Sequence, residues 1–183
     1  HGGACWLEWE DDLRDPDEEI KAAWCERLAD SIEYYKYIQF IFFRQWNAIR
    51  DYAHVNGIKI VGDIPIFVAL DSADVWANRE LFQLEKDGYP TVVAGVPPDY
   101  FSATGQLWGN PLYDWDYHKK THYDWWMRRI KGQLNMVDYI RVDHFRGFEQ
   151  YYAIPYGEET AMHGKWKKGP NEDLFLRMQE VFG

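Results

Sequence analysis

An apolar, strand-like run in the sequence ends abruptly in a group of charged side chains. Ile140 and Val142 alternate with Arg141 and Asp143, and His144 follows at once. A carboxylate at the end of a buried strand, held ionised by a neighbouring guanidinium group, can act as a nucleophile or as an anchoring base. The sequence therefore predicts a catalytic carboxylate at Asp143, with Arg141 two residues before it on the same face of the strand.

Two helix-then-strand units lead up to acidic residues of this kind. Helical spacing of apolar residues predicts a helix over 34–54, and a short strand is predicted to follow it over 58–63. A second helix is predicted over 117–136, with a short strand after it over 138–143. The first strand ends on Asp63 and the second on Asp143. Helix, tight turn and buried parallel strand make an α/β unit, so the predicted fold class is α/β. Shorter helices are predicted over 17–28, over 75–84 and near the end of the chain.

The segment 64–116 separates the two units and is too long and turn-rich for a simple connection. Such loops usually have a function, and in a barrel this one would rise from the C-terminal end of a strand, where active sites form. It carries Tyr100, Phe101, Trp108 and Tyr113 among turn-forming residues. The chain as a whole is 18% aromatic, more than a core of this size requires. Some of these rings are therefore expected on surfaces, where aromatic side chains commonly stack on sugars.

Composition limits the possible partners. The chain has 183 residues, which suits one core but is short for an α/β barrel of about 250 residues. A formal net charge of −10 argues against a nucleic acid or an anionic membrane surface as the main partner. No uncharged apolar run approaches the length of a membrane span. Cys5 and Cys25 lack metal-binding spacing and form no disulfide framework, so a reducing cytoplasm is expected.

Three ordered motifs closely resemble the 4-α-glucanotransferases of glycoside hydrolase family 77, also called amylomaltases or disproportionating enzymes. The motifs are GDIPIFV at Gly62–Val68, GVPPDYFSATGQLWGNPLYDW at Gly95–Trp115 and RVDHFRGF at Arg141–Phe148. The resemblance implies a (β/α)8 TIM barrel that transfers α-1,4-glucan segments between acceptors, with retention of configuration. It also implies maltooligosaccharide partners, and neither a metal nor an organic cofactor.

The resemblance assigns roles to the residues at the two strand ends. Asp143 matches the nucleophile, which attacks the anomeric carbon and becomes a glucosyl ester. Arg141 would keep that carboxylate ionised and oriented. His144 and Asp63 match positions that bind sugar hydroxyls. The residues also allow a structural alternative, in which Arg141 and Asp63 form a buried ion pair across adjacent strands and His144 is an ordinary core histidine.

The long loop receives substrate-binding roles from the same resemblance. Tyr100, Phe101 and Trp108 match a mobile loop whose rings stack on glucose units and shield the ester from water, which favours transfer over hydrolysis. Gln106 is a plausible partner for sugar hydroxyls. Ser102 and Asn110 are others, although any of the three could simply stabilise a turn.

The chain also departs from the family's pattern. A retaining mechanism needs a second carboxyl as acid and base, which the family supplies from a Glu on a later strand. That motif is absent, and Glu172 and Asp173 instead resemble first-turn helix residues. The pattern of early barrel strands is also missing. Residues 1–183 are thus expected to be a central fragment of the catalytic barrel, with 64–116 as an inserted substrate-binding region. We expect this fragment to be inactive by itself and to expose the edges of its strands.

Two other interpretations stay open at this point. A non-catalytic α-glucan-binding module would use the same aromatic rings, but it would not need Arg141, Asp143 and His144 together at a strand end. A different barrel enzyme could use Asp63, Asp143 and His144 as metal ligands. Against the metal site, adjacent residues of a strand point to opposite faces, and Arg141 would repel a cation.

Overall fold

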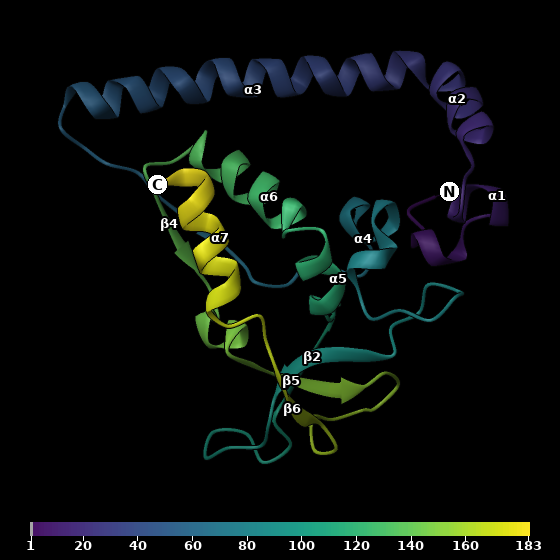
Figure 1. Ribbon diagram of the computed structural model, residues 1–183. Coiled ribbons are helices and arrows are strands. Elements are labelled where there is room, and N and C mark those ends of the chain that lie inside the picture. Colours follow the sequence, from purple (N-terminus) through teal and green to yellow (C-terminus); the bar gives the residue numbers. More distant parts are fainter. Residues whose placement is uncertain (1) are drawn as a thin grey trace. The chain divides into compact units, whose positions relative to one another are not determined.

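The computed structural model describes residues 2–183, and the chain divides into two compact units. Unit 1 comprises the chain as far as Asp63 together with Gly132–Arg141. Unit 2 comprises Ile64–Lys131 and Val142–Gly183. Figure 1 shows the helices and strands of both, coloured along the sequence.

Unit 1 begins with a series of helices. They are η1 (Trp6–Glu8), α1 (Asp11–Arg14), α2 (Glu18–Arg27) and α3 (Ala29–Val55). The carboxylate of Asp17 accepts a hydrogen bond of 2.8 Å from the amide of Ile20 and so caps α2, which confirms the helix predicted over 17–28. The helix predicted over 34–54 is also confirmed, but α3 starts earlier and runs for 27 residues. No helix among residues 2–183 combines the length and apolarity needed to cross a membrane.

The C-terminal half of α3 is tied by polar contacts to the turn before the second strand. The indole N–H of Trp46 donates to the carbonyl of Met136 at 2.8 Å. The carboxylate of Asp138 lies 2.9 Å from His54 Nε2 and accepts from the amide of Ile60 at 2.9 Å. These two contacts, that of the Ile60 amide first, lower the pKa of Asp138 to about 2. Asp138 thus joins three segments of unit 1.

The predicted strand pair exists as β1 (Val61–Ile64) and β4 (Tyr139–Val142), which form a two-stranded sheet. The carbonyl of Ile60 accepts from the amides of Asp138 and Tyr139, and the carbonyl of Ile64 accepts from that of Asp143. Hydrogen bonds therefore advance in the same direction along both strands, so the pair is parallel, as predicted.

The expectation that these strands are buried is wrong. Residues along β4 alternate between exposed and half-buried, and Val61 of β1 is 64% exposed. The physical reason is that, within residues 2–183, this sheet has two strands, so each strand has one ladder neighbour and an open edge. Ile64, at the end of β1, is the exception and is 1% exposed.

Unit 2 contains the remaining helices, apart from the end of α6 beyond Lys131. They are α4 (Ala73–Ala77), η2 (Arg79–Leu81), α5 (Trp115–Lys120), α6 (Asp124–Leu134), η3 (Phe145–Phe148) and α7 (Glu172–Phe182). The single helix predicted over 117–136 is wrong, because the chain breaks between α5 and α6. His122 and Tyr123 both have positive φ, and their amides bond back to the carbonyls of Lys119 and His118. This is a Schellman ending of α5 without the usual glycine.

A four-stranded antiparallel sheet forms the other half of unit 2. Its strands are β2 (Val92–Val96), β3 (Gln106–Pro111), β5 (Gln150–Pro155) and β6 (Lys165–Lys168), in the order β3-β2-β5-β6. Two of them lie within 64–116, the segment predicted as a loop. Gly95 is required where β2 and β3 meet, because a Cβ there would lie 2.2 Å from the carbonyl oxygen of Gln106.

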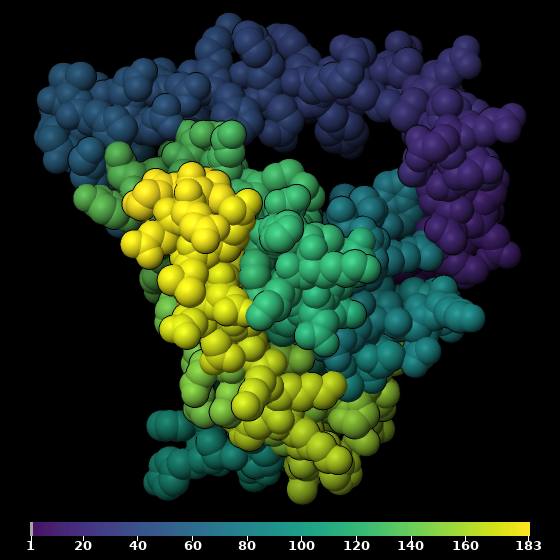
Figure 2. Space-filling view, viewed as in Figure 1, coloured from purple at the N-terminus to yellow at the C-terminus, as the bar shows by residue number. Residues whose placement is uncertain are grey.

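Aromatic rings fill the core of unit 2 beneath its helices. Tyr113, Trp126 and Phe148 are each 1% exposed, and the centre of the Trp126 ring lies 5.6 Å from that of Tyr113 and 5.4 Å from that of Phe148. Figure 2 shows the yellow side chains of α7 lying against the green ones of α5, where Lys119 and Asp173 form an ion pair. The sheet has its own apolar cluster, of Val93, Tyr152, Ile154 and Ala161.

Candidate active site

In unit 1, the end of β1 and the end of β4 are linked by an ion pair. The guanidinium of Arg141 contacts both carboxylate oxygens of Asp63, with Nε 3.0 Å from Oδ1 and Nη2 against Oδ2. This bidentate geometry is the strong form of an arginine–carboxylate contact. The side chain of Arg141 is 68% exposed and that of Asp63 is 52% exposed. The ion pair of the structural alternative therefore exists, but it is not buried.

In unit 2, the chain turns sharply directly after β4. Asp143 is exposed, and its amide is held by the carbonyl of Ile64 at 3.0 Å. His144 has a φ of 51°, a left-handed conformation that non-glycine residues adopt rarely and often at functional sites. The turn is closed by the amide of Gly147, which donates to the carbonyl of His144 at 2.9 Å.

Gly147 has no room for a side chain. A Cβ at this position would lie 2.8 Å from Cδ1 of Ile66 and 2.9 Å from Cδ2 of His144. The glycine therefore lets the histidine ring approach the backbone of η3 closely. Any larger residue would displace the ring, so the RVDHFRGF motif needs glycine at this point.

The imidazole of His144 lies among aromatic rings, and we refer to Phe67, Trp108 and His144 together as the His144 cluster. The ring of Trp108 meets the imidazole edge to face, with centres 4.9 Å apart, and the ring of Phe67 is 6.3 Å away. Burial among these rings, helped by the charge of Arg146 and opposed by that of Asp143, lowers the pKa of His144. A neutral imidazole can both donate to and accept from a sugar hydroxyl.

Trp108 and Gln106 project from β3 beside this histidine. They are two residues apart and so share a face of the strand. The indole N–H of Trp108 donates to the side-chain oxygen of Gln106 at 3.0 Å, and the Trp108 ring is 39% exposed. The structure therefore brings three predicted site residues together, Gln106, Trp108 and His144.

Tyr100 and Phe101 form a separate pair on the loop before β3. They are 97% and 91% exposed, and their rings meet at an interplanar angle of 90°. The loop beneath them is ordered by Asp99, whose carboxylate accepts from the amides of Phe101 and Ser102 at 2.8 Å each. Two large rings held outward on a fixed turn are available for stacking on a ligand.

Three polar residues of the motifs have structural contacts. The hydroxyl of Ser102 donates to the carbonyl of Gly105, and the amide of Asn110 donates to the carbonyl of Val68 at 2.9 Å. The guanidinium of Arg146 lies over the ring of Trp166 at 4.5 Å and so connects η3 to β6. Each of these side chains stabilises the backbone segments that carry the candidate site.

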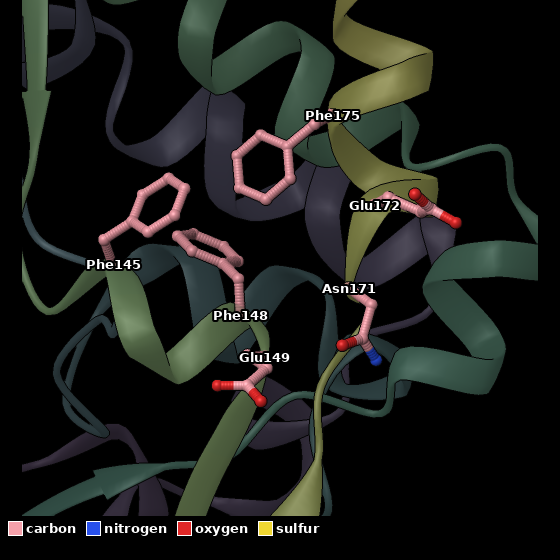
Figure 3. A pocket seen from close by; sticks show the side chains of 6 residues that line it. All are labelled: Phe145, Phe148, Glu149, Asn171, Glu172 and Phe175. Atoms are coloured by element: carbon pink, nitrogen blue, oxygen red, sulfur yellow. The ribbon is translucent and has the colours of Figure 1, made fainter.

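The pocket drawn in Figure 3 is lined by residues in and beside η3 and α7 and has a volume of about 530 Å³. Figure 3 shows three phenylalanine rings gathered at one side, with two carboxylates and an amide at the other; the residues are Phe145, Phe148, Phe175, Glu149, Glu172 and Asn171. None of the residues predicted for the site lines it. Glu172 stands in the first turn of α7, as the sequence indicated.

Residues 2–183 contain no group of three His, Cys, Asp or Glu side chains placed to hold a metal ion. Asp63 is instead engaged with a cation, the guanidinium of Arg141. The interpretation of Asp63, Asp143 and His144 as metal ligands therefore has no support in the described part of the chain.

Comparisons with known proteins agree with the motifs. The family model described as 4-alpha-glucanotransferase, glycoside hydrolase family 77, matches residues 1–182. The chain is 50% identical to the 4-alpha-glucanotransferase of Thermus thermophilus over 183 residues and 47% identical to that of Aquifex aeolicus over 180 residues. These matches cover 100% and 98% of the chain, but 37% of each relative. The chain thus spans little more than a third of the length of these relatives.

Comparison with solved structures agrees with these relatives. The amylomaltase of Streptococcus agalactiae, solved in complex with acarbose, matches with a TM-score of 0.94 and 43% identity, over 100% of this chain and 37% of that one. The amylomaltase of Corynebacterium glutamicum, at 20% identity, shares the fold with a TM-score of 0.71. The chain is therefore an α/β protein of the glycoside hydrolase class. It belongs to the 4-α-glucanotransferase family, and the resemblance found in the motifs is confirmed.

Proposed function

We propose that this chain carries the nucleophile and part of the sugar-binding surface of a 4-α-glucanotransferase, an enzyme that transfers α-1,4-glucan segments between maltooligosaccharide acceptors. The observation that carries the proposal is the family match over residues 1–182, which includes all three motifs. Asp143 is the nucleophile, Arg141 keeps its carboxylate ionised and oriented, and Asp63 and His144 bind sugar hydroxyls. No metal or organic cofactor takes part.

The reaction is a retaining double displacement at the carboxylate of Asp143. A carboxylate oxygen attacks the anomeric carbon, the glycosidic bond breaks, and a glucosyl ester forms; an acceptor hydroxyl then displaces the carboxylate. The departing sugar oxygen needs a proton from a second carboxyl. Asp173 is engaged with Lys119, and Glu172 is in the first turn of α7, so neither is assigned that role. We therefore expect this chain by itself to form the ester only with a donor that leaves without protonation.

The finer assignments follow from the same proposal. The parallel pair of β1 and β4 is part of a (β/α)8 barrel that these two strands do not close, and 64–116 is an inserted substrate-binding region. Tyr100 and Phe101 stack on glucose units, and Gln106 and Trp108 bind beside His144. The solvent exposure of the first two rings and the contact between the second two support these roles.

A second candidate is a non-catalytic α-glucan-binding module. The outward pair of Tyr100 and Phe101 favours it, because such rings bind sugars without any reaction. The two functions differ in what they expect of Asp143. A binding module has no need of its carboxylate, whereas the enzyme requires it.

Maltosyl fluoride in the α configuration separates the two functions, because fluoride leaves without a proton donor. The proposal predicts release of about one fluoride per chain, followed by slow turnover, and loss of this burst in Asp143→Asn. Glu149→Gln, which alters an exposed carboxylate after η3, is the matched control and should keep the burst. Maltooligosaccharide binding without any burst would favour the module, and absence of binding would contradict both.

A further inference from the structure

Three side chains distant in sequence hold the backbone of Pro65–Val68, the segment that follows β1. The guanidinium of Arg129 donates to the carbonyl of Pro65 at 2.7 Å and to that of Ile66 at 3.2 Å. The hydroxyl of Tyr113 also donates to the carbonyl of Ile66, at 2.7 Å, and Asn110 donates to that of Val68. Backbone carbonyls outside a ladder need such partners, and here one arginine satisfies two of them.

Arg129 is fixed in place by its own surroundings. It lies on α6, and its guanidinium sits 4.9 Å from the centre of the Trp126 ring and 5.2 Å from that of Trp125. Trp126 is 1% exposed and Trp125 6% exposed. A planar cation stacked on buried rings keeps one orientation, so its N–H groups point at the two carbonyls.

The segment that Arg129 holds carries one wall of the His144 cluster. Phe67 is 8% exposed, and its ring centre lies 6.0 Å from that of Tyr113, 6.4 Å from that of Trp108 and 6.3 Å from that of His144. Ile66, on the same segment, is 3% exposed. A shift of this backbone would therefore move the Phe67 ring, against which Trp108 and His144 rest.

We propose that Arg129 is a positioning residue for sugar binding: through the carbonyls of Pro65 and Ile66 it sets Phe67 against Trp108 and His144. Arg129 itself touches no sugar in this account. The inference rests on the proposed function for one point, that the ligand of the His144 cluster is a sugar. The effect of Arg129 on the geometry of the cluster does not depend on that function.

The test compares Arg129→Met and Arg129→Lys with Arg128→Met, a change at the exposed neighbouring arginine of the same helix. Two quantities are measured in folded protein: the NMR signals of the Trp108 indole N–H and the His144 ring, and the Kd for maltotriose by calorimetry. Arg129→Met should shift both signals and raise Kd about tenfold, since a displaced wall weakens each contact made by Trp108 and His144. Arg129→Lys, a point charge that reaches one carbonyl, should fall between wild type and Arg129→Met. Arg128→Met should match wild type.

The outcomes separate this inference from the proposed function. If wild type binds no maltotriose, the proposed function fails, but the NMR signals still decide whether Arg129 sets the cluster. Unchanged Trp108 and His144 signals in folded Arg129→Met would overturn the inference even if binding is observed. Should Arg129→Met not fold, Arg129→Lys decides instead, because it keeps the charge and the aliphatic stem; wild-type signals in that variant would also overturn the inference.

Discussion

Two helices of this chain are rich in aromatic residues and have opposite environments. On α6, Trp125, Trp126, Met127 and Ile130 are all buried. On α3 no residue is buried, although large apolar side chains recur along it; those exposed are Tyr34, Tyr35, Tyr37, Ile38, Phe40, Phe42, Phe43, Ile49, Tyr52 and Val55.

The difference lies in the partners that each helix finds. Trp126 of α6 meets the rings of Tyr113 and Phe148 within unit 2. In unit 1, α3 makes polar long-range contacts, between Trp46 and the carbonyl of Met136 and between His54 and Asp138, and none of its residues is buried. Helical spacing of apolar residues thus predicts that a helix forms and which side is apolar, but burial requires an apolar surface on another element.

The largest expected effect is the loss of stability when a buried ring of α6 is removed. Trp126→Ala should destabilise unit 2 by about 3–5 kcal/mol, because it leaves a cavity among the rings that surround it. Phe40→Ala on α3 removes a ring that is 61% exposed and should change stability by less than about 0.5 kcal/mol. Urea unfolding followed by far-UV circular dichroism measures both. Equal losses would mean that α3 is packed as tightly as α6.

The core beside α6 also buries a histidine, and we expect this histidine to make the stability of unit 2 depend on pH. His118 is 0% exposed, and burial lowers its pKa from 6.5 to about 4, against the opposing influences of the Leu81 carbonyl and of Asp114. Since the unfolded chain binds the proton more tightly, stability is fully present above pH 6.5 and is lost as the pH falls toward 4. The loss amounts to about 3 kcal/mol at most.

The stability of His118→Phe should depend less on pH over this window than that of wild type, because an apolar ring has no proton to bind. His122→Gln, on the exposed turn between α5 and α6, is the control and should keep the wild-type slope. Urea titrations at a series of pH values between 7 and 4 supply the measurement. A slope that is unchanged in His118→Phe would show that another group causes it.

Much of the helical structure could be predicted from the sequence, and the exceptions have local physical causes. The helix over 17–28 carries its own cap at Asp17, so sequence alone was sufficient. The break between α5 and α6 was missed because a Schellman ending usually carries glycine, and His122 occupies that position here. The four-stranded sheet was missed because β2 pairs with β5, more than fifty residues away, and short strands with distant partners leave a weak local pattern.

The candidate site was predicted in part for similar reasons. The motifs identified Gln106, Trp108 and His144, which lie together in unit 2, and Arg141 with Asp63, which pair in unit 1. Phe67 lay inside a motif but was not singled out, because a phenylalanine in an apolar run resembles any core residue. Nothing in the sequence pointed to Arg129, whose targets are backbone carbonyls and so leave no side-chain pattern.

The most direct test of the central claim is to identify the carboxylate that α-maltosyl fluoride labels. The chain is incubated with the fluoride, quenched in acid and digested, and the modified residue is located by tandem mass spectrometry. We expect a maltosyl ester on Asp143, absent from Asp143→Asn and retained in Glu149→Gln. A label on another carboxylate, or an unlabelled chain that still binds maltotriose, would contradict the assignment of Asp143 as the nucleophile.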